Sequence, residues 1–119
     1  MSRRPTLEEI RVATTQVFGI SDEDFFSPKR NAHIGTARQA FVLVARDVSG
    51  QAYGYSALSA FLKRQCHSTA MSAERYGLMS LRVNERFRGC VAEIYALLDV
   101  APGPSIASAV ARKPEAMTG

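Results

Sequence analysis

The chain has 119 residues, 46% of them hydrophobic, which is enough for one packed core and leaves no room for a second sizeable domain. Its formal net charge of +4 favours an anionic partner. The two cysteines and two histidines lack the spacing of a zinc site, and no apolar run reaches the about 18 residues that a membrane-spanning helix needs, so a zinc domain and a membrane protein are excluded.

Two helices are predicted at the start of the chain. Thr6 and Glu9 have the spacing of a capping box, in which the hydroxyl accepts a hydrogen bond from the amide of Glu9 and the carboxylate accepts one from the amide of Thr6. The box predicts a first helix that begins after Thr6 and ends near Gly19. Ser21 is expected to cap a short second helix, which Pro28 ends.

A long helix is predicted after the basic loop of residues 29–31. Apolar side chains recur there every three or four residues, as on one buried helix face: Ile34, Ala37, Phe41, Val44 and Val48. Ser49–Gly50 ends the helix. The other face carries Arg38, Gln39 and Arg46, which are therefore candidates for contact with an anionic partner.

A helix-turn-helix is predicted next. Residues 55–62 form its first helix, with apolar residues at helical spacing: Tyr55, Leu58 and Leu62. A basic turn, residues 63–66, leads to the second helix, residues 67–78. Its inner face is expected to hold mostly small residues: Ala70, Ala73 and Tyr76–Gly77. It opens with Ser68 and Thr69, short hydrogen-bonding side chains of the kind that reach base edges or phosphates.

A break near Ser80 and a last helix are predicted from one further apolar stripe: Val83, Phe87, Val91, Ile94 and Leu98. The basic residues around it are interpreted as a solvated face: Arg82, Arg86 and Arg88. From Pro102 the chain is rich in Ala, Ser and Pro without a stripe, so residues 102–119 are predicted to be a disordered tail. No segment has a strand pattern. The predicted fold class is all-α, with an N-terminal arm (residues 1–5), a helical domain (residues 6–101) and the tail.

Positive charge is concentrated around the predicted helix-turn-helix. Residues 28–88 hold ten basic and three acidic residues, a net charge of +7, whereas the rest of the chain holds five basic and eight acidic residues, a net charge of −3. A basic surface of this kind is typical of proteins that bind nucleic acid.

Three blocks within residues 6–98 share the residues of one known family. They are Phe26-Ser27-Pro28-Lys29-Arg30, residues 37–47 with Arg38-Gln39, and residues 62–73 with His67-Ser68-Thr69. They resemble the basic loop, the Arg-Gln helix and the His-Ser/Thr-Thr signature of the C-terminal DNA-binding domain of DnaA, the bacterial replication initiator. The resemblance implies an all-α helix-turn-helix fold and recognition of a duplex similar to a DnaA box.

The resemblance also implies roles for single residues. Arg30 matches the arginine that enters the minor groove, and Ala70 lies where an apolar side chain meets a thymine methyl. Other positions match contacts to phosphates or base edges: Arg38, Gln39, His67, Ser68 and Thr69. Neighbouring polar residues of the basic window are added as candidates for DNA contact: Arg46, Lys63, Arg64 and Gln65.

The chain also departs from the family. Gln65 stands where the family has an arginine, Cys66 stands where some members read a base, and the loop of residues 50–54 is longer. Base preference is therefore expected to differ, while binding to the DNA backbone is retained. No Gly-x-x-x-x-Gly-Lys motif is present, so nucleotide-driven filament assembly and origin melting are not expected.

The sequence thus predicts a double-stranded DNA-binding protein of the cytoplasm, associated with the nucleoid and without a cofactor. It would act as a replication-origin accessory factor or as a transcription regulator, together with replication or transcription proteins. The alternative is a diverged protein-interaction module without sequence-specific DNA binding, which surface aromatic residues in the loop of residues 50–54 would favour. An enzyme is not expected, because adjacent Cys66 and His67 point about 100° apart on a helix and no third group orients them.

Overall fold

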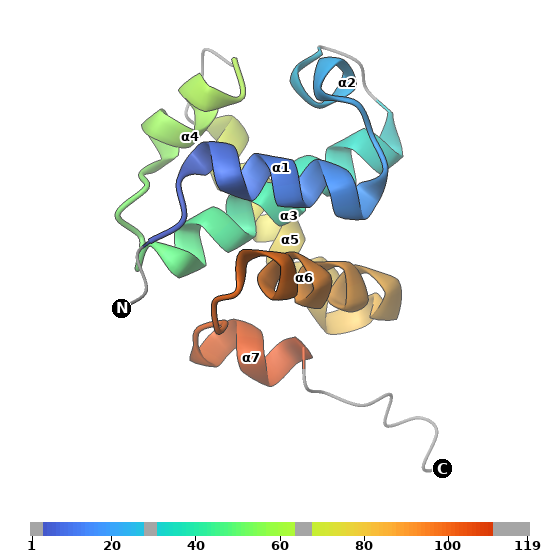
Figure 1. Ribbon diagram of the computed structural model, residues 1–119, viewed down its shortest axis with the longest axis vertical. Coiled ribbons are helices and arrows are strands. Elements are labelled where there is room, and N and C mark those ends of the chain that lie inside the picture. Colours follow the sequence, from blue (N-terminus) through green and yellow to red (C-terminus); the bar gives the residue numbers. More distant parts are fainter. Residues whose placement is uncertain (1–3, 28–30, 64–67, 111–119) are drawn as a thin grey trace.

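The computed structural model describes residues 4–27, 31–63 and 68–110, with the side chain of Ser68 excepted. Every regular element in these ranges is a helix, as predicted, and Figure 1 shows how the helices are arranged. They are α1 (Leu7–Phe18), α2 (Asp22–Phe26), α3 (Ala32–Val48), α4 (Tyr55–Phe61), α5 (Ser68–Val83), α6 (Glu85–Leu98) and α7 (Pro104–Val110).

Short polar side chains begin most of these helices, and the predicted caps are confirmed. Thr6 and Glu9 form both hydrogen bonds of the capping box, at 3.1 and 2.8 Å. Ser21 accepts from the amide of Asp24 at the start of α2. Asn31 caps α3 and Asn84 caps α6 in the same way. The ends of the helices are therefore fixed largely by local sequence.

The long helix α3 lies at the centre of the fold, and it packs against α1 and α5 (Figure 1). Its residues from Phe41 to Ala45 are all buried, as are Ala37 and Ala40. The Phe41 ring meets Phe25 of α2 edge-on and stacks on Phe61 of α4. α3 thus holds α2 and α4 on one common core.

α5 approaches the backbone of α3 closely at Gly77. A Cβ atom at this position would lie 3.2 Å from the carbonyl oxygen of Gln39 and 3.5 Å from Cβ of Leu43. Ala70, on the same side of α5, is fully buried. Small residues therefore set the distance between these two helices, as predicted, although Tyr76, expected on this inner face, is 54% exposed.

The Gly77→Leu variant is expected to lower the free energy of unfolding by about 2 kcal/mol, because the larger side chain forces α5 away from α3. Gly89→Ala is the matched control: a Cβ there meets nothing within 4 Å, and alanine favours a helix over glycine by about 1 kcal/mol. Urea unfolding of both variants measures the two effects. Equal stability of Gly77→Leu and the native chain would contradict the close approach.

The predicted break near Ser80 is wrong. α5 continues to Val83, and the chain turns at Asn84, whose side chain caps α6. Val83 consequently lies outside the buried stripe of α6 and is 83% exposed. The apolar spacing was misleading because Val83 happens to continue the period of the next helix.

The predicted disordered tail begins too early, because Pro104–Val110 form α7. Ile106 is buried against the core, and the carboxylate of Asp47 accepts hydrogen bonds from the hydroxyl of Tyr95 and, at 2.8 Å, from the amide of Gly103. Burial and the neighbouring Asp47 raise the pKa of Tyr95, so it stays a donor. These contacts fix the start of the segment, and residues 111–119 lie outside the described residues.

Candidate nucleic-acid interface

α4 and α5 are consecutive helices packed against each other, as the prediction of a helix-turn-helix requires. Leu58 and Leu62 are buried beneath them, and the hydroxyl of Ser59 accepts a hydrogen bond from the amide of Ala70 at 3.3 Å. Lys63 follows α4 with a φ of 62°, a left-handed conformation that turns the chain. The rest of the turn, residues 64–67, lies outside the described residues.

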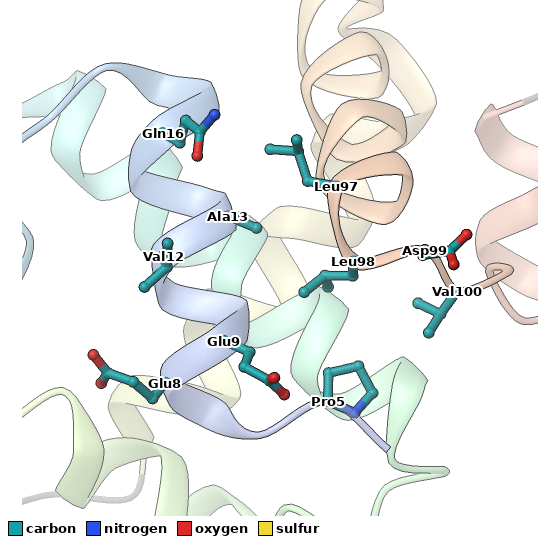
Figure 2. Close-up of a pocket in the computed structure, with 10 residues that line it drawn as sticks. All are labelled: Pro5, Glu8, Glu9, Val12, Ala13, Gln16, Leu97, Leu98, Asp99 and Val100. Carbon is teal, nitrogen blue, oxygen red and sulfur yellow. The ribbon is translucent and has the colours of Figure 1, made fainter. Parts of the chain in front are cut away.

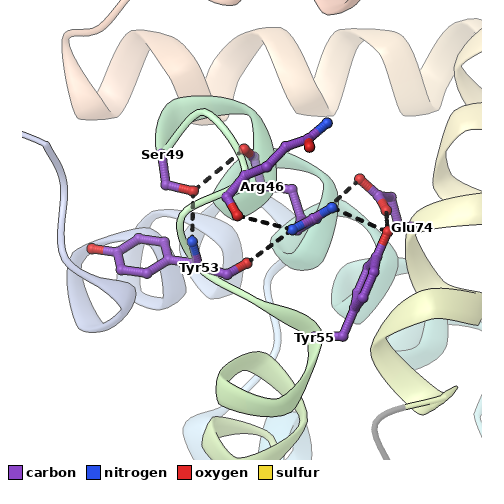
Figure 3. A network of polar contacts seen from close by, with 6 residues as sticks. Arg46, Ser49, Tyr53, Tyr55 and Glu74 are labelled. Atoms are coloured by element: carbon purple, nitrogen blue, oxygen red, sulfur yellow. Dashed lines mark hydrogen bonds and ion pairs between the residues drawn. The ribbon is translucent and has the colours of Figure 1, made fainter.

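A polar cluster fastens both of these helices to α3 (Figure 3). Arg46 of α3 donates to Glu74 of α5 at 3.4 Å and to the hydroxyl of Tyr55 of α4 at 3.1 Å. The Tyr55 hydroxyl in turn donates to Glu74 at 2.5 Å, and this bond raises the pKa of Tyr55. The guanidinium carbon lies 4.1 Å from the centre of the Tyr55 ring. One residue from each helix therefore sets the orientation of the pair.

Arg46 also fastens the loop that precedes α4. Its guanidinium donates to the carbonyl oxygens of Gln51 and Tyr53, at 3.1 and 3.4 Å. The hydroxyl of Tyr53 donates to the carbonyl of Pro5. The Arg46 side chain is only 11% exposed. We therefore attribute to Arg46 the positioning of α4 and α5 rather than contact with DNA.

Arg38, another predicted DNA contact, binds the end of α2. Its guanidinium donates to the carbonyl oxygens of Phe25 at 2.8 Å, Asp24 at 3.2 Å and Ser27. These carbonyls lie immediately before residues 28–30, which include Arg30 and lie outside the described residues. The structure thus places Arg38 against the C-terminal end of α2.

The other predicted contacts fall into three groups. Lys63 is exposed, and its ammonium lies 5.1 Å from the centre of the Phe26 ring. Gln39 and Thr69 are half-buried, and Ser68 begins α5. The last group lies outside the described residues: Arg30, Arg64, Gln65 and His67. Lys63 thus lies directly before the turn between α4 and α5, and Thr69 lies directly after it.

Two arginines of α5 extend the basic surface beyond the predicted residues. Arg75 and Arg82 are exposed, and they line a groove of about 500 Å³ that also includes Tyr55 and Met79. They lie seven residues apart, two helical turns, so they share one face. The same seven-residue spacing in the sequence would have identified Arg75 and Arg82 as one basic face of this helix.

Arg88 does not belong to the solvated face that was predicted for it. It is only 8% exposed, and its guanidinium donates to the carbonyl oxygens of Leu81 at 2.9 Å and Arg82 at 3.3 Å. A cation at these carbonyls completes the C-terminal end of α5. Arg82 and Arg86 are exposed, as expected.

The comparisons with known proteins found no match among family models, curated proteins or solved structures. The resemblance to the DnaA domain therefore stands on the sequence blocks alone. Among the described residues, no helix has both the length and the apolar character needed to cross a membrane, and no three His, Cys, Asp or Glu side chains gather as a metal site.

Proposed function

We propose that this chain binds double-stranded DNA through α4 and α5, with the N-terminal end of α5 in the major groove. The observation that carries this proposal is the Arg46–Tyr55–Glu74 cluster, which holds both helices of the pair in a fixed orientation on α3. Because the two helices are already held in place, inserting the start of α5 into a groove costs little additional conformational entropy.

The distribution of charge supports an anionic partner. Among the described residues, one exposed basic side chain, Arg4, lies near the N-terminus. The other four lie at the turn and along the helices after it: Lys63, Arg75, Arg82 and Arg86. In α1, by contrast, Arg11 is buried and paired with Glu8 and Asp22. Phosphates would therefore meet the side of the molecule that carries the turn and α5.

The resemblance to the DnaA domain supplies the candidate reading residues. Within this proposal Thr69, together with His67 and Ser68, contacts base edges from the start of α5, and Arg30 enters the adjacent minor groove. Lys63, Arg64 and Gln65 contact the backbone from the turn. The protein would then serve as an accessory factor at replication origins or as a transcription regulator, in the nucleoid, and both roles agree with these contacts.

Thr69→Ala tests whether α5 reads sequence. The variant is expected to lose about 1–3 kcal/mol of binding free energy on the best duplex, selected from a random pool, because one base-edge contact is removed. On random duplex the loss is expected to be much smaller, since nonspecific binding depends on phosphates. Fluorescence anisotropy with both duplexes measures the difference.

Lys63→Ala is the matched control, because an exposed lysine at the turn would contact phosphate and its loss would weaken both duplexes alike. Thermal melts are run beside the titrations, since Thr69 lies in the first turn of α5 and its replacement can also cost helix stability. A stable Thr69→Ala variant with equal losses on both duplexes would contradict sequence reading by α5.

A second candidate function is a protein-interaction module without sequence-specific binding. The aromatic residue of the loop before α4 gives it no support, because the hydroxyl of Tyr53 donates to the carbonyl of Pro5. Tyr55, the first residue of α4, is engaged as well, with Glu74. The exposed apolar residues of α5 do favour it: Met71, Tyr76, Leu78, Met79 and Val83. A native chain that folds stably but has no measurable affinity for either duplex would support this candidate.

A further inference from the structure

The second half of α5 presents an apolar surface that DNA contact does not explain. Tyr76, Met79 and Val83 are 54%, 55% and 83% exposed, and their spacing of three and four residues places them side by side. Arg75 and Arg82 flank them on the same helix. Exposed thioether and aliphatic side chains gain nothing from a phosphate backbone, whereas a contiguous apolar patch is typical of a protein contact. We call these five residues the α5 patch.

A groove of about 510 Å³ between α1 and the end of α6 has the opposite character (Figure 2). Val12 of α1 and Leu97 of α6 lie in it and are 46% and 50% exposed. Its other lining residues include three acids and no base: Glu8, Glu9 and Asp99. Glu8 is paired with Arg11, which lowers its pKa, and Glu9 accepts a hydrogen bond from the amide of Thr6, whereas Asp99 is exposed. The groove is thus apolar in its centre and acidic at its rim.

The two surfaces are complementary in charge and alike in apolar content. We propose that the α5 patch of one copy docks in the α1–α6 groove of a second copy. Met79 and Val83 would bury their side chains against Val12 and Leu97, while Arg75 and Arg82 would meet the carboxylates of the rim. Each α5 patch is therefore covered by the groove of a neighbouring copy, and each groove by a neighbour's α5 patch.

Two symmetric dimers are also conceivable, one patch to patch and one groove to groove, but repulsion between like charges disfavours both. An α5-to-α5 contact would place Arg75 and Arg82 against their own copies, and Glu74, the one acid of α5, is held by Arg46 and Tyr55. A groove-to-groove contact would oppose two sets of carboxylates. Like charges brought together across an interface are unfavourable, so the head-to-tail contact is preferred.

A head-to-tail contact lets more than two copies associate, either as an open chain or as a closed ring. α3 packs against both α1, which lines the groove, and α5, which carries the patch (Figure 1). One bound copy therefore leaves a patch exposed at one end and a groove at the other, and further copies can add. A contact between half of one helix and one groove involves few residues, so it is expected to be weak, with a Kd of about 10–100 µM. Added salt is expected to weaken it.

The test uses the full chain without DNA, so its outcome is independent of the proposed DNA binding. Light scattering after size exclusion is expected to give the 13.0 kDa monomer at low concentration and a rising average mass from about 10 µM to about 1 mM. Met79→Glu disrupts only the patch and Leu97→Lys only the groove. Each variant alone is expected to stay monomeric. Both positions are half-exposed, so both variants should fold, which circular dichroism checks.

Mixing the two variants is the decisive step. The Met79→Glu copy keeps an intact groove and the Leu97→Lys copy keeps an intact patch, so an equimolar mixture is expected to associate again. A native chain that stays monomeric to about 1 mM would overturn the proposal. A Leu97→Lys variant that associates as the native chain does, or a mixture that stays monomeric, would overturn it as well.

Discussion

Arg46→Ala is expected to lower the free energy of unfolding by about 3 kcal/mol and the melting temperature by about 10 °C. The side chains of Arg46 and Glu74 are 11% and 18% exposed, so the substitution leaves a poorly solvated carboxylate without its cation. It also removes the cation–π contact with Tyr55 and two hydrogen bonds to loop carbonyls. Urea unfolding followed by circular dichroism measures the loss.

Arg86→Ala is the control, because it removes an exposed arginine of α6 and is expected to change stability by less than about 0.5 kcal/mol. Arg46→Lys keeps the charge but not the forked donor group, so its stability is expected to fall between those of the native chain and Arg46→Ala. If Arg46→Ala unfolds as the native chain does and only its DNA affinity falls, Arg46 is a phosphate ligand after all and the structural role is wrong.

Local chemistry made much of the fold predictable from the sequence. The partners of the Thr6–Glu9 box lie three residues apart, so the start of α1 follows from sequence alone. The stripe from Ile34 to Val48 predicted α3 because its apolar residues recur every three or four positions. The burial of Val42 and Leu43 beside the stripe shows that α3 is covered on more than one side. Where Val83 continued the period of the following helix by chance, the same method misplaced the break.

The roles of the arginines could not be predicted, because their partners are distant in sequence. Arg46 and Glu74 are 28 residues apart, and the carbonyls that Arg38 binds lie 11 to 14 residues before it. A basic residue on the polar face of a helix has the same pattern whether it meets phosphate or carbonyl oxygen. Only the folded chain separates the anchoring arginines from exposed ones such as Arg75 and Arg82.

The helical segment after Pro102 was missed for a similar reason. Ile106 is buried, Ala109 and Val110 pack against the core on the same side of α7, and the distant carboxylate of Asp47 binds the start of the segment. These three apolar residues make a stripe that is too short to stand out in the sequence. Composition predicted disorder because it measures how much apolar surface a segment can bury, and a few well-placed apolar residues change that average little.

The dependence of DNA affinity on salt tests the central claim most directly. Of the ten basic residues in 28–88, the structure assigns Arg38, Arg46 and Arg88 to internal contacts. If five or six of the others neutralise phosphates, log K against log salt concentration is expected to have a slope of about −4 to −6. That slope weakens binding about a thousand-fold between about 50 and about 200 mM salt.

The measurement is a series of anisotropy titrations of the native chain with a labelled duplex at increasing salt, with Lys63→Ala as a second protein. Loss of one phosphate contact is expected to make the slope of Lys63→Ala shallower by about 1. A steep slope for the native chain and a shallower one for Lys63→Ala would support DNA binding at the turn of the helix-turn-helix. Affinity that does not change with salt, or no binding at about 50 mM, would contradict it.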